Sequence, residues 1–196
     1  MNANYTQPSI PARPEVPEGF LRGLYRLLGG ERAQVQLLGP GAIMMEVLTA
    51  RELLRWDWGI EAAVWSVTSY AELHRDGIEC ERRARLHPES PAAQPFVTRT
   101  MSSAQGPVIG VTDYVRAVPE LIRAFVPHRY VTLGTDGFGW RDTRDALRAF
   151  FELDAASIVI AALKALVDEG SMEPARAAAA IARYGRDPVS LPQWSR

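Results

Sequence analysis

From residue 35 onward, short apolar runs alternate with longer stretches in which apolar residues recur every three or four positions. A short apolar run bounded by glycine or proline predicts a buried strand, and the longer period predicts a helix. The pattern predicts strands over 35–38, 62–67, 107–111 and 130–133, and the run at 150–153 would add an edge strand. It predicts helices over 42–56, from Tyr70 onward, from the Thr112–Asp113 pair to 126 with a break at Pro119, and over 142–150, 155–168 and 174–184.

This order of strand, glycine turn, helix and strand indicates one α/β domain. Strands that are joined through helices lie parallel, and the helices then cover both faces of the sheet. We therefore expect four or five strands, mostly parallel, with helices on both faces. The segment 87–104 holds three prolines and is expected to be the longest connection.

The first 34 residues follow a different pattern. Prolines at 8, 11, 14 and 17 favour an extended, polyproline-like arm, because proline is excluded from helix interiors. Residues 18–28 predict a short helix that ends at 29–30, because the apolar residues form one stripe: Phe20, Leu21, Leu24, Leu27 and Leu28. We expect 1–34 to be a proline-rich arm with a short helix, and 35–196 to be the α/β domain.

Charge and composition exclude several classes of function. Lys plus Arg number 22 and Asp plus Glu 23, so a net charge of -1 leaves no electrostatic footprint for nucleic acid or an anionic membrane. Cys80 is the single cysteine, which excludes an internal disulfide, and the three histidines are too scattered for a zinc pattern. The apolar stretches fall short of the ~20 residues that span a bilayer, and the first residues lack secretory-signal features. We expect a soluble, cytoplasmic protein.

The first of two glycine-rich strings, Gly39-Pro40-Gly41, follows a predicted strand and precedes a helix. It resembles the start of a dinucleotide-binding fingerprint, in which backbone amides approach a phosphate. However, Met44 stands at the third glycine position and Pro40 removes one amide donor. We interpret this string as a tight turn, with a small nucleotide-binding protein as a less favoured reading.

The second string, Gly-Thr-Asp-Gly-Phe-Gly at 134–139, stands at the carboxyl end of a predicted strand. Open α/β sheets bind ligands at that edge. The carboxylate of Asp136 has three candidate roles: it caps the following helix, pairs with Arg141 or Arg144, or binds a ligand. The turn-and-cap role is favoured on local grounds.

The segment 75–83 is densely charged with both signs. We expect Asp76 to pair with Arg83, and Glu79 with Arg82 or Arg83, in an ion-pair lattice at a surface or an interface. Cys80 is interpreted as a structural thiol, because it has no histidine at a short fixed spacing. The sequence therefore indicates no catalytic residue and no metal ligand.

Several strings occur in a fixed order along the chain: Met-Asn-Ala-Asn-Tyr at 1–5, Val-Gln-Leu-Leu-Gly at 35–39, Val-Trp-Ser-Val-Thr-Ser-Tyr at 64–70, Glu-Leu at 72–73, Arg-Asp-Gly at 75–77, Cys-Glu-Arg at 80–82, Leu-His-Pro at 86–88, Thr-Asp-Tyr at 112–114, Leu-Gly-Thr-Asp-Gly-Phe-Gly at 133–139, Arg144 and Phe-Glu-Leu-Asp at 151–154. Taken together in this order and spacing, they resemble the C-terminal third of the homodimeric bacterial pyruvate dehydrogenase E1 family. The resemblance extends from residue 1 to about residue 184. It implies a transketolase C-terminal-type domain: a three-layer α/β sandwich with a mostly parallel, about five-stranded sheet.

The resemblance also implies a function. The family decarboxylates pyruvate on thiamine diphosphate and Mg²⁺ and transfers the acetyl group to the lipoyl group of the acetyltransferase E2. Upstream domains hold the cofactor, whose Gly-Asp-Gly signature is absent from this sequence. The segment is therefore expected to bind no cofactor by itself, to be inactive alone, and to serve dimer assembly and the entrance to the active site. The alternative is a free-standing, non-catalytic assembly or binding module of the same fold.

Site residues follow from the resemblance with two departures. The arm residues expected nearest the active site are Asn2, Asn4, Tyr5 and Thr6. Some family members carry a histidine where Thr6 stands, so no acid–base role transfers to this position, and Arg141 stands in place of a small serine. The candidates for turn or interface residues are Asp136, Gly137, Phe138, Arg144, Asp76 and Arg82.

Overall fold

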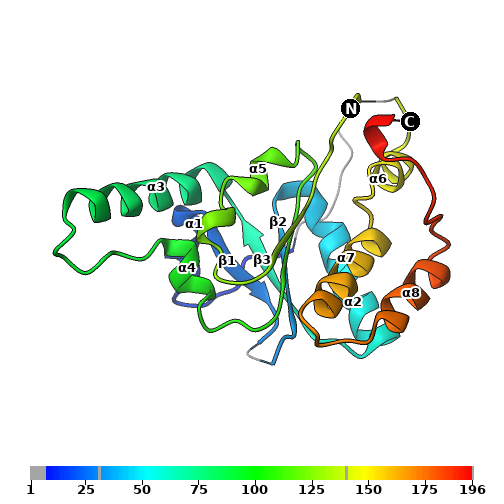
Figure 1. The fold of residues 1–196 in the computed structure, drawn as a ribbon, viewed down its shortest axis with the longest axis horizontal. Helices are drawn as coiled ribbons and strands as arrows, with labels where there is room; N and C mark the ends of the chain where they lie inside the picture. Colours follow the sequence, from blue (N-terminus) through cyan, green and yellow to red (C-terminus); the bar gives the residue numbers. More distant parts are fainter. Residues whose placement is uncertain (1–7, 31, 140, 196) are drawn as a thin grey trace.

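The structure is a computed structural model that describes residues 8–30, 32–139 and 141–195 (Figure 1). The strands are β1 (Leu24–Leu28), β2 (Val35–Gly39), β3 (Ala62–Val67), β4 (Val108–Val111) and β5 (Tyr130–Leu133). The α-helices are α1 (Val16–Arg22), α2 (Met44–Trp58), α3 (Tyr70–Leu86), α4 (Phe96–Met101), α5 (Ala117–Glu120), α6 (Arg144–Phe150), α7 (Ala155–Asp168) and α8 (Pro174–Arg183). Short 3₁₀ turns are η1 (Gly41–Ile43), η2 (Arg123–Phe125) and η3 (Gln193–Ser195).

The strands form one five-stranded sheet in the order β1-β3-β2-β4-β5. The pairs β2–β3, β2–β4 and β4–β5 are parallel, and only β1 runs antiparallel to its neighbour β3. The chain therefore moves from β2 outward to β3 and then crosses to β4 on the other side of β2. The expected mostly parallel, five-stranded α/β sheet is confirmed.

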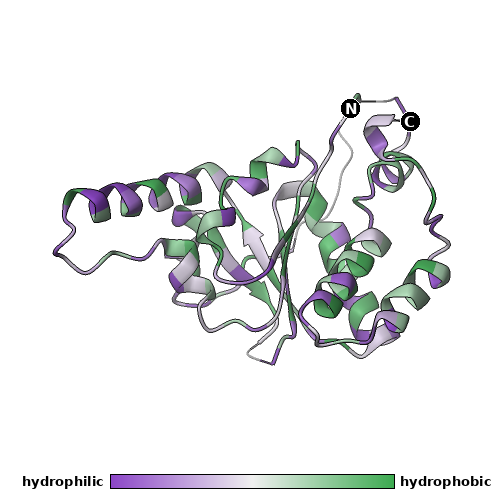
Figure 2. Ribbon diagram, in the orientation of Figure 1, coloured by the Kyte–Doolittle hydropathy of each residue, from purple (hydrophilic) through white to green (hydrophobic). Residues whose placement is uncertain are grey.

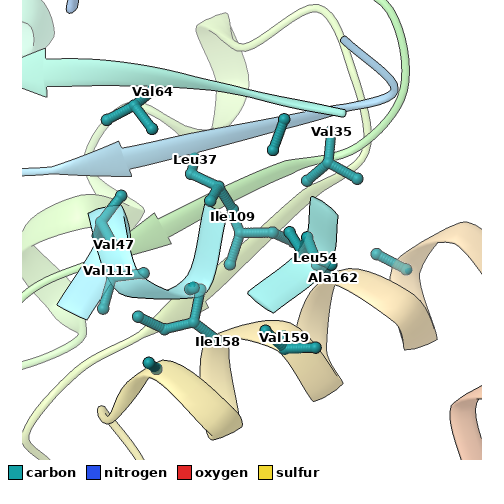
Figure 3. Packing of buried hydrophobic residues seen from close by; sticks show 14 of the residues in the cluster. Val35, Leu37, Val47, Leu54, Val64, Ile109, Val111, Ile158, Val159 and Ala162 are labelled. Carbon is teal, nitrogen blue, oxygen red and sulfur yellow. The ribbon is translucent and has the colours of Figure 1, made fainter. Parts of the chain in front are cut away.

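Side chains of the central strands alternate between two apolar layers. Val35, Leu37 and Ile109 belong to a cluster with α2 and α7, whereas Leu38 and Val108 belong to a second cluster with α3 and α4. Figure 3 shows the first cluster, in which labelled side chains of β2, β4, α2 and α7 pack together on one side of the sheet. Burial on both faces explains why these strands read as continuous apolar runs, and it confirms helices on both faces of the sheet.

Most predicted helices are present, and their ends follow the expected local chemistry. Ser69 accepts a hydrogen bond from the Glu72 amide at the start of α3, and Asp154 accepts one from the Ser157 amide at the start of α7. Pro174 is the first residue of α8, where its missing N–H costs no hydrogen bond. In Figure 2, α3 is more hydrophilic than α7, and its buried residues lie in its first half, at Tyr70, Leu73 and Gly77.

The helix expected over 18–28 is wrong. The chain instead forms α1, a break at Gly23 and then strand β1. Gly23 has a φ of 103°, a left-handed conformation that ends the helix, and β1 gains backbone hydrogen bonds from β3. Of the predicted stripe, Leu24 and Leu27 are buried in the strand, whereas Phe20, Leu21 and Leu28 are exposed. The division of the chain at residue 34 stays a prediction.

Two further expectations are corrected. No continuous helix runs over 112–126, where the described chain has only α5 and η2. Residues 150–153 form no edge strand: Glu152 has a φ of 57°, and the Leu153 amide donates to the Arg148 carbonyl in a turn after α6. The fifth strand is β1 instead. The long connection at 87–104 contains α4.

Candidate functional site at the carboxyl edge of the sheet

Two loops meet beyond the carboxyl ends of β4 and β5. The Thr135 amide donates to the Tyr114 carbonyl at 2.8 Å, and its hydroxyl donates to the Asp113 carbonyl at 3.2 Å. Thr112 is fully buried between them, and its hydroxyl accepts from the Tyr114 amide. Ends of parallel strands converge on one edge, which is where open α/β sheets bind ligands. The string at 134–139 therefore lies where the sequence placed it.

The carboxylate of Asp136 lies inside this arrangement. It accepts a hydrogen bond from the Arg116 amide at 3.0 Å and forms an ion pair with the Arg116 guanidinium at 3.3 Å. The Asp136 amide donates to the Gln193 side chain at 3.3 Å, so the C-terminal segment is bound to the same turn. Asp136 thus joins three segments that are distant in sequence. Its pairing with Arg116, at the start of α5, was not among the roles that the sequence indicated.

Glycines allow the turn to pass close to its neighbours. A Cβ on Gly134 would lie 2.5 Å from the Cα atom of Arg116, which is backbone and has little room to move. Gly137 has a φ of 117°, a conformation that side chains other than glycine rarely adopt. The turn therefore requires glycine at these two positions for two different reasons.

Around the turn, four large apolar side chains are exposed. Phe138 is 91% exposed, and the other three are Tyr114, Val115 and Trp194. A Cβ on Gly137 would lie 3.6 Å from the Trp194 backbone, so the loops carrying Phe138 and Trp194 are adjacent. We call these four residues the edge patch. Exposed apolar groups that gather in this way mark surfaces which contact another protein segment.

A cavity of about 780 Å³ lies beside the edge patch. Its lining comes from the loops after β2, β4 and β5 and from α6: Ala42, Ile43, Asp113, Thr135, Gly139, Asp142, Thr143, Arg144, Asp145, Leu147, Arg148, Phe151 and Leu153. Arg144, a predicted interface residue, is the first residue of α6 and lines this cavity. The mixed lining of carboxylates, guanidiniums and apolar groups suits a polar ligand or a protein loop.

One wall of this cavity is held by a partly buried ion pair. Glu46 on α2 accepts a hydrogen bond from Arg148 on α6 at 2.7 Å, and the two side chains are 19% and 13% exposed. The second oxygen of Glu46 accepts from the Ala155 amide at 2.9 Å. A single carboxylate on α2 thereby positions both α6 and the start of α7.

The predicted residues Asp76 and Arg82 lie elsewhere. Both are on α3, which extends to the opposite side of the molecule from α6 (Figure 1). Asp76 pairs with Arg22 at 2.6 Å and accepts from the Phe96 amide at 2.5 Å, so it joins α1, α3 and α4. The expected pairing of Asp76 with Arg83 is replaced by this one.

Glu79 forms the ion pairs that the charged segment predicted. It lies 3.8 Å from Arg82 and 2.9 Å from Arg83. These pairs are largely exposed and contribute at most about 1 kcal/mol each. Arg82 therefore belongs to a surface lattice on α3.

The described residues do not fit a site for Mg²⁺ and a diphosphate. Within residues 8–30, 32–139 and 141–195, no group of three or more His, Cys, Asp or Glu side chains could hold a metal ion. His74 and His128 are engaged with backbone carbonyls at 2.8 and 2.9 Å. Burial raises the pKa of the Cys80 thiol, which disfavours the reactive thiolate. No chemical step can be derived for these groups.

The arm residues Asn2, Asn4, Tyr5 and Thr6 lie outside the described residues. Within the described part of the chain, no helix is both long and apolar enough to cross a membrane.

Comparison with known proteins identifies close relatives. The chain is 47% identical over 192 residues to a pyruvate dehydrogenase E1 component of Cupriavidus necator, covering 96% of this chain and 21% of that protein. It is 49% identical over the same length to the Pseudomonas aeruginosa protein of that name, covering 96% and 22%. The chain thus spans about a fifth of the length of the curated relatives it matches. It is homologous to the C-terminal portion of these E1 components.

Solved structures support the fold alone. A transketolase mutant of Pichia stipitis matches 80% of this chain and 20% of its own, with a TM-score of 0.54 and 15% identity. A transketolase from Leishmania mexicana matches 77% and 19%, with a TM-score of 0.52 and 18% identity. The family model for the transketolase-like C-terminal domain matches residues 23–154, which include the whole sheet and the edge loops. The chain belongs to the transketolase-like C-terminal domain family.

Proposed function

We propose that this chain acts as the C-terminal domain of a pyruvate dehydrogenase E1 enzyme. That enzyme decarboxylates pyruvate and transfers the acetyl group to a lipoyl group on the acetyltransferase E2. The observation that carries the proposal is the 47% identity over 96% of the chain to a protein of that name. The identity continues across elements that pack on both faces of the sheet, so it reflects the whole domain.

Thiamine diphosphate and Mg²⁺ belong to the proposal as cofactors of the complete enzyme. The described residues of this chain offer no matching set of metal ligands. We infer that domains outside this segment hold the cofactor and supply its chemistry. This chain then contributes shape and contacts around the site.

The edge patch is the surface that we assign to those contacts. Phe138 and the other residues of the edge patch are exposed on loops that the hydrogen bond between Asp136 and the Arg116 amide holds together. Their apolar side chains are therefore presented on a well-ordered backbone. A rigid exposed patch loses little entropy when another segment covers it. The arm residues Asn2, Asn4, Tyr5 and Thr6 are proposed to lie nearest the active-site entrance.

The proposed partners are the upstream E1 domains, a second E1 subunit in a homodimer, and E2, in the cytoplasm. Asp76 and Arg82 on α3 and Arg144 at the cavity are the further interface candidates. Contacts through Arg82 would be weak and salt-sensitive, because exposed ion pairs are screened.

A domain exchange tests the proposal. In the Cupriavidus necator relative, this chain replaces the region to which it is 47% identical, and pyruvate-dependent acetyl transfer is measured. We expect an active, dimeric chimera. Phe138→Ser in the chimera should lower activity or weaken the dimer, whereas Trp56→Ser, at a 74% exposed position on α2, should not. A folded but inactive chimera would refute the proposal and favour the free-standing assembly module.

The isolated chain provides a second test. With pyruvate, thiamine diphosphate and Mg²⁺ it should release no carbon dioxide above the level of a protein-free control. Release that depends on the chain would contradict the assignment of the cofactor site to other domains.

A further inference from the structure

The two edge strands of the sheet share one kind of contact. Edge strands carry unpaired N–H and C=O groups, and these form a template on which another strand can add. Here β1 and β5 are the edge strands. On each of them, an arginine guanidinium donates to a carbonyl of the strand: Arg13 on β1 and Arg123 on β5. Both arginines lie outside the sheet, so the contacts are not part of its ladder.

The carbonyl on β5 points away from the sheet. The carbonyls of Arg129 and Leu133 accept from β4 and from the residue after it, at 2.8 and 3.0 Å. Carbonyls alternate along a strand, so that of Tyr130 faces the open side. Arg123 donates to it at 2.6 Å. The guanidinium therefore occupies a position that an added strand would need.

On β1 the same reasoning identifies the open side. The Gly23 carbonyl accepts from the Thr68 amide at 2.9 Å, which places it toward β3. By alternation, the carbonyls of Leu24 and Arg26 point outward. The register with β3 shifts between Arg26 and Leu28, which leaves Leu27 as an extra, bulged residue. Two consecutive carbonyls, those of Arg26 and Leu27, are then available on the open side.

Arg13 takes both of these carbonyls. One of its terminal nitrogens donates to Arg26 and to Leu27, the latter at 3.0 Å. The turn that presents Arg13 is fixed at its own backbone: its amide donates to the Pro11 carbonyl at 3.0 Å, and its carbonyl accepts from the Val16 amide at 3.1 Å.

Helix α1 covers the rest of the β1 edge. A Cβ on Gly19 would lie 2.5 Å from the Leu24 carbonyl oxygen, so the helix lies directly against that outward group. Val16, at the start of α1, is buried with Tyr25 and Leu27 in the apolar cluster and anchors the helix. Arg13 thus covers the part of the β1 edge that α1 does not reach, the carbonyls of Arg26 and Leu27.

We propose that Arg13 keeps the β1 edge closed against strand pairing with a second copy of this chain. The same end of β1 in a second copy is the occupant that fits, because the two stretches that α1 leaves uncovered, residues 26–28, can pair antiparallel about a two-fold axis, with each contact made twice. The open side continues into Leu28, which is 42% exposed and adds an apolar contact to such a pair. This inference goes beyond the proposed enzymatic role and does not depend on it.

The test compares four variants of the full chain. Arg13→Met keeps an apolar stem of similar length but has no donor, whereas Arg13→Lys keeps a charged donor. Arg85→Met is the matched control, because Arg85 is an exposed arginine on α3 for which no ion pair is found among the described residues. Sedimentation velocity across concentration should show at least tenfold tighter self-association for Arg13→Met, and no change for Arg13→Lys or Arg85→Met. Arg13→Ala, which also removes the stem, should behave like Arg13→Met and provides a second variant if the first fails to fold.

A cross-link locates the contact. In a Cys80→Ser background, Leu28→Cys should form an intermolecular disulfide readily with Arg13→Met and little with native Arg13 or Arg13→Lys. The proposal is overturned if Arg13→Met and Arg13→Ala self-associate no more than the Arg85→Met control. It is equally overturned if they associate without cross-linking at position 28.

Discussion

Replacing Gly137 by valine should destabilise the protein through its backbone rather than through a clash. A Cβ at this position would have its nearest neighbour at 3.6 Å, an ordinary van der Waals distance. The φ of 117°, however, is a conformation that a β-branched residue adopts only under strain. Such strain costs about 1–3 kcal/mol. Steric overlap therefore adds little, and the backbone determines the expected magnitude.

Gly139→Val is the matched control within the same turn. A Cβ on Gly139 meets nothing within 4 Å, and its φ is not in the left-handed range. We expect this variant to change the free energy of unfolding by less than about 0.5 kcal/mol, as for most exposed substitutions. The two variants add the same side chain two positions apart, so their difference reports the backbone conformation.

Urea denaturation and thermal melting measure the difference. For a chain of this size, about 1–3 kcal/mol corresponds to a fall in melting temperature of roughly 2–12 °C. If both variants melt at the same temperature as the original chain, the left-handed turn at Gly137 is wrong.

Three further changes test other parts of the structure. Glu46→Ala should lower the free energy of unfolding, measured by urea denaturation, by about 2–4 kcal/mol, because it leaves the guanidinium of Arg148, which is 13% exposed, without its ion-pair partner. An unchanged urea midpoint would contradict the role of Glu46 in positioning α6 and α7. Gly77→Ala should cost about 1–3 kcal/mol by overpacking, since the added Cβ would lie 2.2 Å from a ring carbon of Phe125; a stabilised variant would show that the ring moves freely. The hydrogen bond from Arg123 lowers the pKa of Glu120 in the folded protein. The ionised Glu120 therefore contributes its full stabilisation at pH values above its ordinary pKa of 4.5, and this stabilisation is lost as the pH falls through the lower pKa of the folded state. Glu120→Gln should therefore make stability less dependent on pH in that acid range, by less than about 1 kcal/mol, and an unaltered pH profile of unfolding would count against the pair.

The sequence alone determined the elements whose signals are local. Strands β2, β3 and β4 are buried on both faces, so they are mostly apolar runs between turn residues. Strand β5 is buried on one face and half-buried on the other. The predicted bounds of all four strands are confirmed within a residue. Helix α7 was predicted with its observed bounds, because its cap and its apolar period lie within the helix itself. The parallel sheet followed from the alternation of these elements, and the resemblance to the E1 family followed from strings of neighbouring residues.

Only the tertiary structure decided the contacts between distant segments. The stripe over 18–28 suits a helix or a strand, and pairing with β3 determined that Leu24–Leu28 is a strand. Asp136 lies near Arg141 and Arg144 in sequence, yet it pairs with Arg116 because the loops after β4 and β5 meet in space. Asp76 likewise pairs with Arg22, 54 positions away.

The hydrogen bonds from Arg13 to β1 and from Arg123 to β5 could not be predicted from the sequence either. Arginine is abundant in this chain, with Lys164 the single lysine among 22 Lys and Arg residues, so no local feature distinguishes Arg13 or Arg123 from the others. What distinguishes them is the direction of backbone carbonyls on strands elsewhere in the chain. A hydrogen bond to a carbonyl depends on where the fold places that carbonyl, and residue type records only that a donor is present.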